Sequence, residues 1–175
     1  MLYWPAAISE HDFSAAEIAD ITGVSHALQR QWRVRYLDFR QAFFVHYGPR
    51  KHGFWSWEGV QLLALFDRAM TDLGSAEMAR RVLMLDQEPG ITRDELGIYH
   101  SDQRAPEGGD LFIVGDLSLG GDARFATAGA SYLAGMLVPE TDLTSAMPRH
   151  YLLNFSAFQR DLFERVLKRL PDLAG

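Results

Sequence analysis

The sequence predicts an α+β fold, with a mainly helical N-terminal part that contains a small β-hairpin and a C-terminal part that mixes helix and strand. Apolar residues recur at helical spacing behind serines that can cap helices, and two aromatic, strand-prone runs flank a Gly/Pro turn. The turn-forming run Gln87-Glu-Pro-Gly90 then separates two stretches of different charge. We therefore expect two domains, residues 1–86 and 91–175, in a chain of 175 residues.

The composition excludes several classes of protein. The chain is 47% hydrophobic and 23% charged, which is typical of a globular protein and not of a disordered or collagen-like one. Its first residues lack a basic leader with an apolar run, and no stretch approaches the roughly 20 apolar residues that a bilayer needs, so we expect a cytoplasmic protein without a membrane partner. The absence of cysteine excludes a disulfide scaffold, a thiolate zinc site and a cysteine nucleophile.

Charge is unevenly distributed along the chain. Residues 86–148 contain three basic and eleven acidic side chains, whereas residues 24–54 contain six basic side chains and one acidic, Asp38. A run of cations is often only a solvated face, so charge alone does not identify a binding surface. Together with the motifs that follow, the net charge of +5 over residues 24–54 indicates a local basic surface.

Two short helices are predicted near the start of the chain. Ser14 and Glu17 have the spacing of a capping box, in which each side chain satisfies a free backbone N–H, so a helix begins after Ser14 and ends near Gly23. Ser25 then caps a second helix that runs to Arg35. A helix, a short turn with glycine and a second helix form the layout of a helix-turn-helix.

The second helix has two different sides. The residues expected to face inward recur at four-residue spacing and are Val24, Leu28 and Trp32. The residues expected to face the other way are Gln29, Arg30 and Arg33. This arrangement predicts a polar, cationic surface on the second helix.

A hairpin and two further helices follow. The aromatic runs 43–47 and 54–55 predict two strands around a turn over residues 48–53 that holds two cations and a histidine. Ser56 can cap a third helix that ends at Gly74, and Ser75 opens a fourth over residues 76–85. Beyond the boundary, we expect a short helix over 92–96, strands over 111–117, 124–138 and 151–155, and a closing helix capped by Ser156.

Residues 13–85 resemble the winged helix-turn-helix DNA-binding region of the mercury-resistance-regulator (MerR) family. The resemblance is carried by the string FSAAEIADITGVS at residues 13–25, by Arg30 and Trp32, by FWSWEGV at residues 54–60 and by DLGS at residues 72–75. It covers about two-fifths of the chain and includes the order of the elements as well as the strings. It implies a DNA-binding protein that acts as a dimer.

This chain departs from the family at several positions. Members usually have leucine, glycine and arginine where this chain has Gln29, Tyr36 and Gly53. Leu28 would take over the packing of the missing leucine. Tyr36 must either adopt or avoid the left-handed backbone conformation, which glycine adopts without strain. The chain also breaks soon after Leu85, so it lacks the long coiled-coil helix through which typical members dimerise.

The predicted helix-turn-helix and wing indicate which residues would contact DNA. Side chains from the N-terminal half of a recognition helix reach base edges in the major groove, where Gln pairs with adenine and Arg with guanine. The wing tip would lie along the phosphates and release counterions. The candidates in the helix are Ser25, His26, Gln29, Arg30, Arg33 and Arg35, and those in the wing are Tyr47, Arg50, Lys51 and His52. Three tryptophans, Trp32, Trp55 and Trp57, are expected in the core and not against bases.

The acidic part carries no recognisable catalytic or metal-binding pattern. Asp110, Asp116 and Asp122 lie near predicted strand ends with His100 upstream, but their spacing matches no ligand loop, and they are better explained as turn-forming and solubilising residues. We therefore expect no enzyme, no cofactor and no metal. Apolar residues of this part make self-association or a ligand groove plausible.

These observations predict a transcription regulator that binds double-stranded DNA as a homodimer and is associated with the nucleoid in the cytoplasm. RNA polymerase or a small-molecule effector is left open as a further partner. Two alternatives remain: an excisionase-like architectural protein, which would bend DNA strongly, and a protein–protein adaptor that uses its acidic C-terminal domain. An adaptor would show no salt-dependent DNA binding.

Overall fold

The computed structural model describes residues 2–37, 44–47, 52–83, 96, 98–99, 110, 112–116 and 150–174. The α-helices are α1 (Ala6–Ser9), α2 (Ala15–Thr22), α3 (His26–Arg35), α4 (Trp57–Leu73), α5 (Ala76–Val82) and α8 (Phe155–Arg169), and a 3-10 turn covers Pro171–Ala174. The strands are β1 (Leu2–Tyr3), β2 (Phe44–Tyr47), β3 (His52–Trp55), β4 (Ile98–Tyr99), β5 (Phe112–Asp116) and β6 (His150–Asn154). The described chain is mainly helical with small two-stranded antiparallel sheets, so the predicted α+β class is confirmed.

Side-chain caps begin α2, α3, α4 and α5 where the sequence predicted them. Ser14, Ser25, Ser56 and Ser75 each accept a hydrogen bond from the backbone N–H three residues further on. The first of these is a complete capping box, because the Glu17 side chain also accepts from the backbone of Ser14. Such caps satisfy N–H groups that have no partner inside the helix.

Two glycines end helices where the sequence predicted, and both adopt the left-handed conformation. Gly23 follows α2 with φ of 82° and Gly74 follows α4 with φ of 66°. A side chain at either position would strain the backbone, since only glycine adopts positive φ freely. The glycine at each of these two positions therefore determines where α2 and α4 end.

The start of α8 differs from the prediction. Asn154 caps this helix by accepting from the N–H of Ala157 at 2.8 Å, and the expected cap, Ser156, is a buried residue inside the first turn. Strand β6 runs directly into the helix, so the cap is the last residue of the strand. Asparagine caps a helix as well as serine does, and only the strand pairing decides between them.

Of the three sheets in the described part of the chain, two form from strands that the sequence predicted. The hairpin β2–β3 pairs Phe44 with Trp55, and β5 pairs with β6, both from predicted strands. The pair β1–β4 had no sequence signal. The predicted strand over 124–138 lies outside the described residues, and so does the helix over 92–96 except for the buried Leu96.

One hydrophobic core joins residues from both parts of the chain. Trp57 is fully buried, and its ring lies 5.0 Å from Trp4 and 5.8 Å from Phe13. Leu162 and Val166 of α8 belong to the same buried cluster. The predicted division of the chain into two domains is therefore not tested by this core.

All three tryptophans expected in the core, Trp32, Trp55 and Trp57, are buried.

A buried polar network crosses this core. The backbone carbonyl of Leu96 accepts from the indole Nε1 of Trp4 at 2.9 Å and from Nε2 of Gln61 at 2.7 Å. Nε2 of Gln159 in α8 donates to Oε1 of Gln61 at 3.1 Å, and both glutamines are fully buried. Buried amides are stable only when they are hydrogen-bonded, so these contacts fix how α4 and α8 lie against each other.

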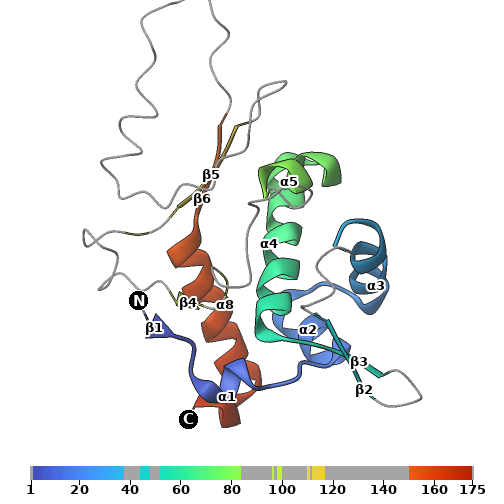
Figure 1. Ribbon diagram of the computed structural model, residues 1–175. Helices are drawn as coiled ribbons and strands as arrows, with labels where there is room; N and C mark the ends of the chain where they lie inside the picture. The colour runs from blue at the N-terminus through green and yellow to red at the C-terminus, as the bar shows by residue number, and fades with distance from the viewer. Residues whose placement is uncertain are drawn as a thin grey trace, which may run out of the picture.

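The helices are arranged around α4, the longest helix of the described residues. In Figure 1, α8 lies on one side of α4, while α3 and the β2–β3 hairpin lie on the other. Helix α3 is joined to α4 by ring contacts of Phe66, which lies 5.2 Å from Trp32 and 5.4 Å from Tyr36. The surface formed by α3 and the hairpin is therefore turned away from α8.

We predict that the two buried glutamines act as a pair. Gln159→Leu leaves Oε1 of Gln61 buried without this donor and should lower the free energy of unfolding by about 1–3 kcal/mol in urea titrations. The double variant Gln61→Leu with Gln159→Leu removes both amides and should be more stable than the sum of the two single effects predicts. Strictly additive effects would contradict the pairing.

Candidate nucleic-acid interface

The turn between α2 and α3 is held by one threonine and one glycine. The hydroxyl of Thr22 donates to the carbonyl of Ile18 at 2.8 Å and accepts from the N–H of Val24 at 3.1 Å. Gly23 supplies the left-handed backbone, and Val24 is buried. The turn therefore sets the direction in which α3 leaves α2.

Helix α3 buries one side and exposes the other. Gln29 and Trp32 are each 2% exposed. The residues of the opposite side, which we call the outer face of α3, are all exposed and have the spacing i, i+3, i+4 and i+7: Ala27, Arg30, Gln31 and Val34. Residues so spaced form one continuous strip along a helix, which suits it to lie in a groove.

Gln29 and Leu28 have exchanged the places predicted for them. Gln29 is buried, and its Nε2 donates to the carbonyls of Ala15 at 2.9 Å and Val24 at 2.8 Å. It therefore occupies the inward position at which the family resemblance implies leucine, and the expectation that it contacts a base is wrong. Leu28 is 38% exposed, so the expectation that it replaces that leucine in the core is wrong too.

Tyr36 does not adopt the left-handed backbone conformation that glycine adopts without strain. Its φ is −125° and its ψ is −22°, and its backbone N–H donates to the carbonyl of Trp32 at 2.8 Å. The ring packs against Phe66. A large side chain is therefore accommodated here without left-handed backbone.

The other predicted residues of α3 lie at its surface. Ser25, His26, Arg30 and Arg35 are exposed, whereas Arg33 is partly buried and already has a partner. Among the described residues, Arg30 and Arg35 form no ion pair. No carboxylate of that part of the chain therefore occupies their guanidinium groups.

The predicted wing is described only in part. The backbone of Tyr47 pairs with that of His52 in the hairpin, which is bound to the segment before α2 through Phe13 and Trp55. The Phe13 N–H donates to the Trp55 carbonyl at 2.9 Å, and the reverse bond measures 2.8 Å. The predicted contacts Arg50 and Lys51 lie outside the described residues.

Gln31 is a further candidate residue, which was not predicted from the sequence. It is exposed and next to Arg30 on the outer face of α3. The helical spacing contains the signal: once Gln29 points inward, a residue two positions later points outward. The amide of Gln31 offers a donor and an acceptor on the surface that Gln29 does not reach.

The described part of the acidic half shows no catalytic arrangement. Asp110 accepts from Nδ2 of Asn154 at 2.5 Å and lies 3.4 Å from Nη1 of Arg160, so it joins the start of α8 to the loop before β5. Within the described residues, no three carboxylate or histidine side chains gather as a possible metal site. The side chains of His100, Asp116 and Asp122 lie outside the described ones.

Comparisons of the chain with protein-family models, with curated protein sequences and with solved structures find no match. None of the helices in the described part of the chain combines the length and the apolar character that crossing a bilayer requires.

We predict that the two glutamines of α3 have different roles in stability. Gln29→Ala should lower the free energy of unfolding by about 1–3 kcal/mol, because it removes a buried amide and two hydrogen bonds. Gln31→Ala, on the same helix but exposed, should change it by less than about 0.5 kcal/mol. Urea unfolding of both variants tests this, and equal losses would refute the assignment of faces.

We also predict that acid weakens the cap of α2. Burial alone would raise the pKa of Glu17, but hydrogen bonds from the Ser14 hydroxyl and N–H and the contact with His11 lower it overall. A carboxyl with a lowered pKa stabilises the fold above its unfolded pKa, and this contribution is lost as the pH falls through the folded pKa.

The stability advantage of the parent over Glu17→Gln should therefore shrink as the pH falls below 4.5, the ordinary pKa of a glutamate side chain. Thermal unfolding at several pH values measures it. Glu164→Gln, at an exposed position of α8, is the charge-matched control. An advantage that grows in acid would contradict the assigned direction.

Proposed function

We propose that this chain binds duplex DNA, with residues 13–83 acting as a winged helix-turn-helix and the outer face of α3 lying in the major groove. The observation that carries the proposal is the division of α3 into a buried side and an exposed strip of four residues at helical spacing. A helix anchored along one side presents the other as a rigid reading surface. The major groove admits a helix in this way.

The outer face of α3 contains the side-chain chemistry that reads bases. Arg30 can donate two hydrogen bonds to a guanine, and Gln31 can pair with an adenine, each worth about 1–3 kcal/mol of discrimination. Ala27 and Val34, the latter 61% exposed, can contact thymine methyl groups. We propose Arg30 and Gln31 as the specificity-determining residues.

The β2–β3 hairpin is proposed as the wing. It lies on the same side of α4 as α3 and away from α8 (Figure 1), so one duplex can meet both. Arg50 and Lys51 belong to the wing tip by sequence and would contact phosphates. His26 and Arg35, at the two ends of α3, would contact the backbone beside the groove.

We further propose that the chain regulates transcription as a homodimer. A two-fold dimer would read half-sites about 34 Å apart, one turn of the double helix. The exposed apolar Leu28 and Val34 favour a second candidate, an adaptor that uses α3 to bind a protein. The two candidates differ in salt dependence, since only DNA binding releases counterions.

The proposal predicts different effects for three single substitutions in binding selections on random duplexes. Arg30→Ala and Gln31→Ala should each remove the preference for one base pair, worth about 1–3 kcal/mol, while non-specific binding persists. Arg169→Ala removes an equal charge at an exposed position at the end of α8 and should leave the preference and its salt dependence unchanged. An unchanged base preference in both α3 variants, or no DNA binding by the parent at low salt, would refute the proposal.

A further inference from the structure

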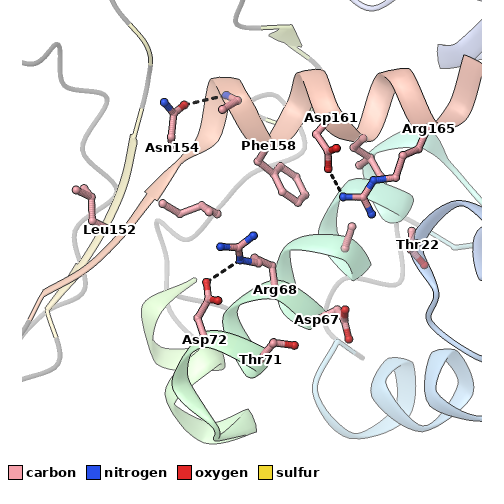
Figure 2. Close-up of a pocket in the computed structure, with 14 residues that line it drawn as sticks. Thr22, Asp67, Arg68, Thr71, Asp72, Leu152, Asn154, Phe158, Asp161 and Arg165 are labelled. Carbon is pink, nitrogen blue, oxygen red and sulfur yellow. Dashed lines mark hydrogen bonds and ion pairs between the residues drawn. The ribbon is translucent and has the colours of Figure 1, made fainter.

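A cleft of about 700 Å³ opens between α4 and α8 and reaches β6 and the last residue of α2. Figure 2 shows Leu152 and Asn154 at one end and Asp67 and Thr22 at the other. Its size is in the range that holds small organic ligands. The outer face of α3 does not line it, so the cleft is separate from the proposed DNA-binding surface.

Two of the three carboxylates in the cleft are already neutralised. Asp72 accepts from Nε of Arg68 at 2.8 Å, one turn away on α4, and also from the hydroxyl of Tyr151 at 3.1 Å. Asp161 forms an ion pair with Arg165, one turn away on α8. Figure 2 shows these two pairs on facing helices. Each guanidinium therefore has its counter-charge on its own helix.

Asp67 is the carboxylate that remains. It is partly buried in α4, and no described residue forms a hydrogen bond or ion pair with its side chain. Burial raises its pKa above the ordinary value, in keeping with a carboxylate that has no described partner. Among the described residues that line the cleft, the ionised side chains thus have one negative charge in excess, and it lies at the end near Thr22.

The wall formed by β6 and α8 supplies apolar surface. Phe158 projects from α8 toward α4 (Figure 2), and Leu152 of β6 is 44% exposed although it is a large apolar residue. Leu162 also lines the cleft. A ligand with an apolar body and one charged end would therefore complement both this wall and Asp67.

We propose that this cleft binds a small organic cation, a protonated amine on an apolar body, with its ammonium group against Asp67 and its body along Phe158. Such a ligand supplies the counter-charge that Asp67 lacks and covers the exposed apolar side chains. An anion would meet an uncompensated carboxylate and two guanidinium groups that are already paired. Charge complementarity therefore selects a cation.

Three probes with the same phenylethyl-type body and different end groups test the proposal: phenethylamine, 2-phenylethanol and phenylacetate. In isothermal titrations of the full chain at neutral pH without DNA, phenethylamine should bind at least about tenfold more tightly than the alcohol, and phenylacetate should be weakest. Asp67→Asn should abolish the advantage of the amine over the alcohol. Asp172→Asn, at an exposed position of the C-terminal turn, removes the same charge and should preserve it.

Equal affinity for the amine and the alcohol, or no binding of any probe at millimolar concentration, would overturn the proposal, and so would an amine preference that survives in Asp67→Asn. The comparison of the three probes uses the parent chain and does not depend on the stability of a variant. Because no DNA is present, the outcome is also independent of the proposed DNA binding.

Discussion

The packing of α4, α8 and the first residues of the chain depends on a few hydrogen bonds around one buried carbonyl. Leu96 accepts from Trp4 near the start of the chain and from Gln61 in α4, and Gln61 accepts from Gln159 in α8. An unpaired amide in this core would cost more than any single apolar contact returns, so the three segments must meet in one register. Aromatic packing around Trp57 then fills the space that this register defines.

The same logic explains the orientation of α3. Gln29 is inside because two backbone carbonyls at the start of α2 and in the turn accept from its amide. Trp32, beside it, packs on Phe66 of α4. With that side fixed, Arg30 can only face outward. A polar residue in the core thus determines which polar residues reach solvent, and the surface chemistry of the helix follows from its interior.

Much of the fold was predictable because local chemistry determines it. The caps at Ser14 and Ser56 and the left-handed Gly23 act over four residues or fewer, so the sequence contains their whole cause. Gln29 was assigned to the wrong face because periodicity treats every amide as polar, while its burial depends on acceptors brought close by folding. Asp67 gave no signal at all, since the cleft around it is built from segments far apart in the sequence.

The joint core also has a consequence for synthesis. Gln61 and Gln159 are 98 residues apart, and Leu162 and Val166 cover a core that otherwise consists mainly of residues before position 84. A ribosome must release α8 before that core can close. Until then the nascent N-terminal helices expose apolar surface, so we expect them to depend on chaperones for longer than an autonomous domain of the same length would.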